Sequence, residues 1–234
     1  MTTIQQNISR VHEEISKICQ RIGRDPKDIT LVAVTKFAPI EAIQEAVNFG
    51  VIDIAENKVQ EGQQKYPSVK PSPSKGSLKR HLIGHLQTNK VKDALKVFDL
   101  IQSVDSLKLA QEIEKQTQKL NRSADILVQV NISEEEQKFG ADQSEALRLI
   151  EEILQLKNIQ IQGLMTMAPF TEDQQMIRDC FRGLRELKNQ VKEKFQGHPN
   201  LQMKFLSMGM SGDYAIALEE GSNMLRIGSA IFKS

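Results

Sequence analysis

The sequence has almost no net charge and no long apolar run, and each absence excludes a class of protein. Its 234 residues include 31 lysines and arginines against 30 aspartates and glutamates, a formal net charge of +1. No global field therefore attracts the chain to nucleic acid or to a membrane surface. No apolar stretch approaches the ~18 residues of a membrane span, and the first residues lack a signal-peptide core. We expect a cytoplasmic protein that binds neither nucleic acid nor membranes.

Cysteine and histidine are also scarce, and neither suggests a reactive or metal centre. Cys19 and Cys180 each lie among apolar residues at helical spacing, which predicts buried thiols rather than catalytic ones. His81 and His85 lie four residues apart on a predicted strand, so their side chains would stand roughly 13 Å apart. That distance is too long for one ion, and we predict no metal site.

Short apolar runs alternate with segments of helical periodicity along the whole chain. Eight runs read as strands: 29–35, 51–56, 80–84, 99–103, 126–131, 161–167, 204–208 and 224–227. Eight strand–helix units predict a (β/α)8 TIM barrel, with residues 1–234 as a single domain. An amphipathic helix from about Ile4 to Ile22, ended by Gly23, precedes the first strand and covers the bottom or flank of the barrel.

One insertion differs in composition from the rest. Residues 66–77 contain three prolines and four serines between the second helix and the third strand. We predict a mobile surface loop on the side opposite the active face of the barrel, with Tyr66 beside it.

Lys36 follows the first predicted strand directly. The run 29–35 is typical of a buried parallel strand, and the carboxyl ends of barrel strands are where working residues gather. A lysine at this position is either a solvated loop residue or a Schiff-base nucleophile. The position alone leaves both interpretations open.

The loops after the last two strands favour an anion. Ser207, Gly209, Ser211 and Gly212 follow the seventh strand, and Gly228 and Ser229 follow the eighth. Each alone is a flexible turn, but together at these strand positions they predict a phosphate site. Arg226 should point into the barrel, where it needs either an interior carboxylate such as Glu56 or a ligand atom. Pyridoxal 5'-phosphate (PLP) would satisfy the lysine, the phosphate loops and the arginine together.

With these residues the sequence resembles a known family, the YggS/PROSC-type pyridoxal-phosphate homeostasis proteins. The matching blocks are residues 33–36, 55–61, 81–90, 129–131, 138–140, 163–167, 206–211 and 226–232. The resemblance implies a modified barrel similar to the N-terminal, cofactor-binding domain of alanine racemase. It also implies that Lys36 carries the cofactor as an internal aldimine, that Ser207, Ser211, Gly228 and Ser229 form the phosphate cup, that Arg226 faces the pyridine nitrogen, and that Asn57 lies near the ring. Two departures, Thr35 and the lack of glycine after Phe232, do not touch this chemistry.

The predicted site favours a carrier over an enzyme. A free lysine has a pKa near 10.4, so about one amine in 2,500 is neutral at pH 7, and partial burial together with Arg226 should lower that pKa. Arginine opposite the ring nitrogen opposes ring protonation and weakens the cofactor as an electron sink. Alanine racemases also use arginine, but they pair the lysine with a tyrosine. Of the two tyrosines here, Tyr66 is expected on the wrong face and Tyr214 is a poor second acid.

We therefore expect a protein that holds or passes on PLP in vitamin B6 homeostasis, without established catalysis. A weak PLP-dependent amino-acid racemase and a Schiff-base aldolase are the alternatives. Candidate recipients are apo-PLP enzymes, and we expect a monomer. Lys138 or Lys233 is a candidate for a second, transient PLP site.

Overall fold

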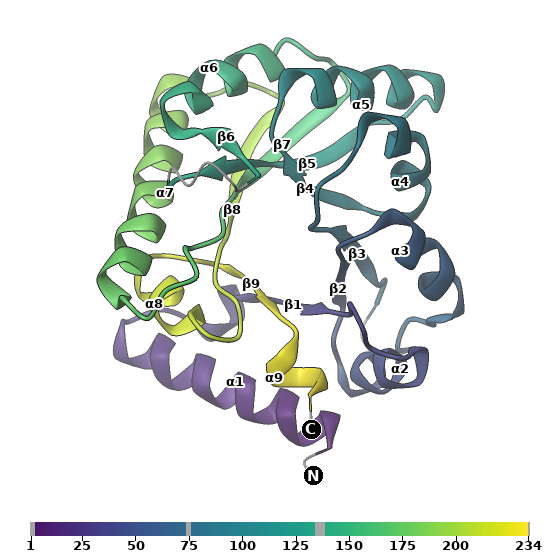
Figure 1. Cartoon of the computed structure of the whole chain (residues 1–234), viewed down its shortest axis with the longest axis vertical. Helices are drawn as coiled ribbons and strands as arrows, with labels where there is room; N and C mark the ends of the chain where they lie inside the picture. Colours follow the sequence, from purple (N-terminus) through teal and green to yellow (C-terminus); the bar gives the residue numbers. More distant parts are fainter. Residues whose placement is uncertain (1–2, 74–75, 134–138, 234) are drawn as a thin grey trace.

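The computed structural model describes residues 3–73, 76–133 and 139–233, and they form a closed barrel of parallel strands. Helices surround the ring of strands, as Figure 1 shows. The strand order is β4-β3-β2-β1-β9-β8-β7-β5-β6, and a further pairing of β4 with β5 closes the barrel. All of these neighbours pair in parallel. The predicted (β/α)8 barrel is confirmed.

Every predicted strand segment overlaps a strand of the barrel. The barrel strands are β1 (Thr30–Val34), β2 (Asp53–Glu56), β3 (Lys79–Leu82), β4 (Leu100–Val104), β5 (Ala124–Asn131), β7 (Ile159–Met165), β8 (Leu201–Ser207) and β9 (Met224–Ile227). The short β6 (Ala141–Asp142) pairs only with the end of β5 among the described strands. Strands β3, β5, β7 and β8 begin earlier than predicted, because their first residues include polar ones, such as Asp125 and Gln202, that interrupt the apolar pattern.

The helices lie between successive strands and at the two chain ends. They are α1 (Ile4–Arg21), α2 (Ile40–Phe49), α3 (Val59–Lys65), α4 (Val91–Val97), α5 (Leu107–Lys119), α6 (Gln143–Ile153), α7 (Gln174–Lys194), α8 (Tyr214–Glu219) and α9 (Ser229–Phe232). Their apolar faces cover the outer surface of the barrel and form the larger part of the core.

The N-terminal helix α1 covers the flank of the barrel rather than its bottom. It contacts α2, α8 and α9, and Figure 1 shows it running along the outside of the ring beside the C-terminal helix. Val11, Ile15 and Cys19 recur at helical spacing and are buried on one face. Gly23 adopts a left-handed backbone with φ of 69°, the conformation predicted for a residue that ends a helix.

The interior of the barrel is filled by a smaller core. Its buried apolar residues come from most of the strands: Val32, Val34, Ala55, Leu100, Leu127, Met165 and Met224. Buried polar residues on the barrel strands, among them Asp53, His81 and Gln102, share this interior. The barrel is therefore packed below its mouth, so that space for a ligand lies at the carboxyl ends of the strands.

The segment after α3 differs from the prediction. Tyr66 is 1% exposed and packs edge to face on Phe98 with ring centroids 5.9 Å apart, and Val69 is also buried. The expectation that Tyr66 lies with a surface loop is therefore wrong. The reason is the spacing of Tyr66 and Val69 across a 3-10 turn (Tyr66–Ser68), which turns both side chains inward. Part of the proline-rich segment, residues 74–75, lies outside the described residues.

The scarce residue types also have defined positions. Cys19 and Cys180 are both buried, as predicted. His81 bonds to Asp53, whereas His85 stacks on Phe139 and contacts Asp105. In the described part of the chain, no group of three or more histidine, cysteine, aspartate or glutamate side chains is arranged to hold a metal ion. Within that same part, no helix has the length and apolar character needed to cross a membrane.

Candidate functional site

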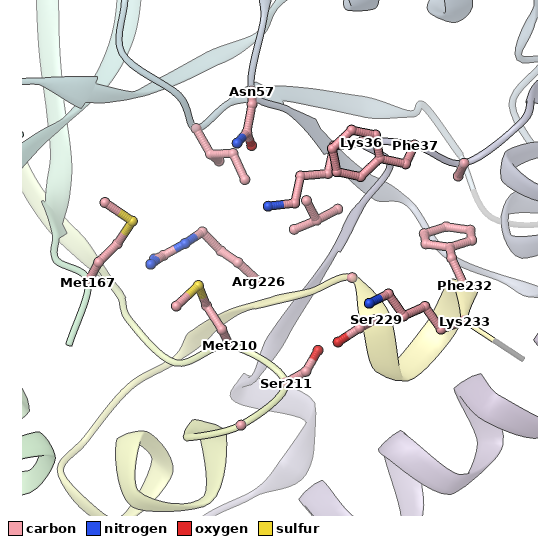
Figure 2. Close-up of a pocket in the computed structure, with 15 residues that line it drawn as sticks. Lys36, Phe37, Asn57, Met167, Met210, Ser211, Arg226, Ser229, Phe232 and Lys233 are labelled. Atoms are coloured by element: carbon pink, nitrogen blue, oxygen red, sulfur yellow. The ribbon is translucent and has the colours of Figure 1, made fainter. Parts of the chain in front are cut away.

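A cavity of about 550 Å³ opens at the carboxyl ends of β1, β2 and β9. Its polar and glycine lining includes all the predicted site residues except Ser207: Lys36, Asn57, Ser211, Arg226, Gly228 and Ser229. Figure 2 shows the amine of Lys36 and the guanidinium of Arg226 pointing into the same central space. Ser211 and Ser229 lie near each other on one side of that space. Barrel closure thus brings together residues that are far apart in the sequence.

Lys36 is the second residue after β1. Thr35, between the strand and the lysine, is fully buried and anchors the turn through its backbone N–H to Ala55 O at 2.9 Å. Phe37 follows in a left-handed conformation with φ of 67°, so the chain turns sharply beyond the lysine. Lys36 itself is exposed, and the expectation of partial burial is wrong. Its amine is therefore accessible from solvent as well as from the cavity.

Arg226 lies on β9 and is 4% exposed. Its guanidinium donates to the hydroxyl of Ser207 at 2.7 Å and to the carbonyl of Thr166 at 2.8 Å. Burial lowers the pKa of Arg226 to about 10, with the Asp213 carboxylate opposing the shift, so the group is charged at neutral pH. These two bonds use two of its five N–H groups. Arg226 lines the cavity, and its guanidinium points into it (Figure 2).

The alternative prediction, that Glu56 is the partner of Arg226, is wrong. The Glu56 carboxylate accepts from Lys65 Nζ at 2.8 Å and from Thr35 Oγ1 at 2.7 Å. It is absent from the cavity lining and its side chain is fully buried on the helix side of β2. Arg226 instead relies on neutral acceptors inside the barrel.

The loops after β8 and β9 together form a small polar concavity. Ser211 and Gly212 come from the first loop, and Gly228 and Ser229 from the second. The two loops are joined by a hydrogen bond from Ala230 N to Ser211 Oγ at 3.3 Å. Gly228 lies close to the barrel wall, where an added Cβ would meet Val34 O at 3.3 Å. Hydroxyls and backbone N–H groups of this kind are suited to bind a phosphate.

Asp213 stabilises the first of these loops. Its carboxylate accepts a hydrogen bond from Met210 N at 2.5 Å, across the turn that contains Ser211. Burial raises the pKa of Asp213, and the bond from Met210 together with the charge of Arg226 opposes that shift.

Ser207 lies elsewhere. It is the last residue of β8 and is fully buried, with its hydroxyl donating to Gln102 Oε1 at 2.6 Å and accepting from Arg226. Its side chain points into the barrel interior, whereas the chain leaves the strand before it reaches Ser211. The prediction that Ser207 belongs to the phosphate cup is therefore wrong for its hydroxyl, which both neighbours already occupy.

Asn57 follows β2 and lines the cavity from the side opposite the two loops. The backbone of Gly84 packs directly against it, and an added Cβ on Gly84 would lie 2.1 Å from Asn57 O. This close approach requires glycine and fixes the backbone of Asn57.

Sequence reasoning missed the apolar walls of the cavity. Ile83, Met167, Met210 and Phe232 line it, and in the sequence they are indistinguishable from core residues at strand and helix ends. Lys233, predicted as part of a second site, lines this same cavity. Lys138 lies outside the described residues.

Neither tyrosine lines the cavity. The Tyr66 hydroxyl lies 3.3 Å from Thr35 Oγ1 behind the barrel wall, and burial raises its pKa. The Tyr214 hydroxyl donates to the Glu14 carboxylate on α1, and burial together with Glu14 raises its pKa. Both hydroxyls are therefore engaged away from Lys36.

The fold and the cavity define a parallel (β/α)8 barrel with an accessible lysine and a polar loop pair at its mouth. The family model described as "Alanine racemase, N-terminal domain" matches residues 4–234. A pyridoxal phosphate homeostasis protein from Aquifex aeolicus is 40% identical over 227 residues, which cover 97% of this chain and 96% of the relative. The chain belongs to the pyridoxal phosphate homeostasis protein family, within the alanine racemase N-terminal domain class.

Two solved structures are similar to this chain over nearly its whole length. An unknown protein from Bifidobacterium adolescentis superposes with a TM-score of 0.92 at 34% identity, covering 98% of this chain and 94% of that one. PipY from Synechococcus elongatus, solved with PLP bound, has a TM-score of 0.79 at 32% identity. The match covers 93% of this chain and 99% of PipY.

Proposed function

We propose that this protein binds PLP in the cavity at the barrel mouth and holds or passes it on, without turning over a substrate. The observation that carries the proposal is that Lys36, Arg226 and the two loops that contain Ser211 and Ser229 line one cavity. A primary amine, a cation and a phosphate-binding concavity are the three features that an aldehyde-bearing pyridine phosphate requires. The PLP-bound structure of PipY, a relative in the same family, supports the same ligand.

Each group has a separate role in this proposal. The Lys36 amine would hold PLP through its aldehyde group. Ser211 and Ser229, with the backbone around Gly228, would bind the phosphate, and Asn57 would lie beside the ring. Arg226 would offer N–H donors to the ring nitrogen. Bound PLP supplies carbonyl and electron-sink chemistry, which this arrangement restrains.

The surroundings of Lys36 support a carrier more than a racemase. A racemase needs an acid and a base on opposite faces of the substrate carbon, and the tyrosine hydroxyls of this chain bond to Thr35 and Glu14 instead. The exposure of Lys36 supports transfer of the cofactor to an amine of another protein, such as an apo-PLP enzyme. The two buried cysteine thiols are in keeping with a reducing, cytoplasmic setting.

The visible absorption spectrum of the purified protein, before and after borohydride, tests the proposal. We expect an absorption band of a PLP–lysine adduct that borohydride abolishes, and no racemisation of amino acids above background. A protein that shows no band of this adduct, even after PLP has been added and unbound PLP removed, would contradict PLP binding, and measurable turnover of alanine would restore the racemase alternative.

A further inference from the structure

A chain of buried polar side chains crosses the barrel interior from β2 to β9 and ends at Arg226. Asp53 Oδ1 lies 2.9 Å from His81 Nε2, and His81 Nδ1 lies 2.8 Å from Gln102 Nε2. Gln102 Oε1 accepts from Ser207 Oγ at 2.6 Å, and Ser207 accepts from Arg226 at 2.7 Å. All five side chains belong to residues that are at most 6% exposed. They come from five different strands, so only barrel closure connects them.

The hydrogen bonds that link these five side chains all run in one direction, from Arg226 toward Asp53. Arginine has no acceptor, so Arg226 must donate to Ser207, whose single hydrogen then goes to the carbonyl oxygen of Gln102. The amide nitrogen of Gln102 is thereby turned toward His81 and meets Nδ1 as an acceptor. The same nitrogen also lies 3.3 Å from the weak acceptor Met224 Sδ, in keeping with this orientation.

The direction of the chain sets the protonation of His81. With Nδ1 as an acceptor, the imidazole is neutral and carries its proton on Nε2, which donates to the Asp53 carboxylate. The cation of Arg226 and the anion of Asp53 thus stand at opposite ends of a chain in which every donor points toward Asp53. Such aligned hydrogen bonds polarise one another in a buried setting.

Reversing the Gln102 amide would disrupt this arrangement at both ends. Its nitrogen would then face Ser207, which already receives a hydrogen bond from Arg226, and its oxygen would require a proton on His81 Nδ1. With Asp53 still an acceptor at Nε2, His81 would have to become a buried imidazolium. The orientation of the Gln102 amide therefore determines whether the Ser207 hydroxyl is held as an acceptor for Arg226.

We propose that His81 and Gln102 are positioning residues for Arg226. By holding Ser207 as an acceptor, they keep one edge of the guanidinium against the interior, while the Thr166 carbonyl holds a second N–H group. Arg226 lines the cavity, so the N–H groups that are left would be available to the ring nitrogen of bound PLP. This role rests on the proposed function, because the ring nitrogen belongs to PLP.

Two variants of His81 differ in whether they offer Gln102 a hydrogen-bond acceptor at the position of Nδ1. Asparagine and leucine have nearly the same shape, and both leave Asp53 without its partner. Only asparagine places an oxygen where Nδ1 accepts from Gln102. We expect His81→Leu to weaken PLP binding at least tenfold and to shift the absorption maximum of the bound cofactor. His81→Asn should restore both toward the native values.

These comparisons have clear contrary outcomes. Equal losses in the two variants, or native affinity and spectrum in both, would overturn the positioning role. Circular dichroism melting of each variant reports whether the barrel is intact, and a difference in folding alone would not move the absorption maximum of the remaining bound fraction.

A measurement on the unaltered protein without PLP tests the same hydrogen bonds directly. Nitrogen-15 NMR of the imidazoles should show His81 neutral with its proton on Nε2, its signals being assigned by their loss in His81→Asn. A proton on Nδ1, or on both nitrogens, at pH 7 would overturn the proposal. If PLP fails to bind the native protein while this tautomer is found, the proposed function fails and the hydrogen-bond direction stands.

Discussion

Ser207 and Ser211 lie four residues apart, yet Ser207 accepts a hydrogen bond from Arg226 inside the barrel while Ser211 lines the cavity with the loops. The two hydroxyls should therefore serve opposite ends of the ligand. Ser211→Ala removes a contact to a charged phosphate worth roughly 1.5–3 kcal/mol, so affinity for PLP should fall by about tenfold or more. Affinity for pyridoxal, which lacks the phosphate, should be unchanged.

Ser207→Ala is the matched control for this prediction. It removes the acceptor of Arg226 and leaves the loops intact, so PLP and pyridoxal should lose affinity by similar factors. Fluorescence or absorption titrations with both ligands measure the four constants. A phosphate-selective loss in Ser207→Ala, or an equal loss for both ligands in Ser211→Ala, would contradict the assignment of the two hydroxyls.

The second prediction concerns Lys36 as the attachment point. Lys36→Ala should abolish borohydride-stable labelling by PLP while changing the free energy of unfolding by no more than about 0.5 kcal/mol, because the side chain is exposed. Peptide mapping after reduction locates the label. Lys233→Ala is the control, since that lysine lines the same cavity and should leave labelling at Lys36 intact. A label found solely on Lys233 in the native protein would refute the assignment.

Arg226 provides the third prediction. If its guanidinium keeps the ring nitrogen unprotonated, exchange of the α-proton of alanine should be near background in the native protein. Arg226→Glu offers the nitrogen an acidic partner and should raise that exchange without efficient racemisation, because no well-placed second acid is available. Proton NMR of alanine in heavy water measures exchange directly.

Arg226→Gln is the control for this substitution. It has the same length as glutamate and also loses the bonds to Ser207 and Thr166, but it has no acid to protonate the ring. Exchange in the glutamine variant should stay near background. Rapid exchange and racemisation by the native protein would overturn the carrier interpretation.

The fourth prediction follows from Asp213. Because burial raises its pKa in the folded protein, its contribution to stability is complete below the unfolded value near 4 and is lost as the pH rises through the folded value. Asp213→Asn keeps an oxygen for Met210 N and removes this dependence. The stability of the variant relative to the native protein should therefore increase as the pH rises above about 4. Urea unfolding at several pH values measures it, and a constant difference would count against the prediction.

Gly209 provides the fifth prediction. It has φ of 97°, and an added Cβ would lie 2.6 Å from Ala217 Cβ, so Gly209→Ala should destabilise the loop after β8. We expect a loss of roughly 1–3 kcal/mol in the free energy of unfolding. Gly212→Ala is the control, because nothing lies within 4 Å of its added Cβ. Similar urea midpoints for the two variants would show that Gly209 is not constrained.

Local patterns in the sequence were sufficient for the strands and for most of the polar lining of the cavity. The apolar run before Lys36 marks a buried strand, and a barrel gathers the residues after such strands at one end. That reasoning correctly placed Lys36, Arg226 and the loops with Ser211 and Ser229 together. The family resemblance added the ligand and the position of Asn57.

Other features had no local signal. The spacing of Ser207 and Ser211 looks the same whether a strand ends between them or not, and the structure ends β8 at Ser207. Tyr66 precedes a polar, proline-rich segment but is held in the core by Phe98. The sequence allows Glu56 as a partner for Arg226. In the structure Lys65, nine residues after Glu56, donates a hydrogen bond to the Glu56 carboxylate instead.

The sequence by itself determined the barrel, the lysine at its mouth and the glycine- and serine-rich loops, because strand periodicity and turn chemistry act over a few neighbouring residues. Only the tertiary structure decided which acceptor Arg226 meets. Asp53, His81, Gln102, Ser207 and Arg226 are joined by barrel closure, which brings Gln102 and Ser207 together across 105 residues of sequence. Hydrogen-bond direction in such a buried chain depends on every member at once, so it becomes defined only when the last strand is in place.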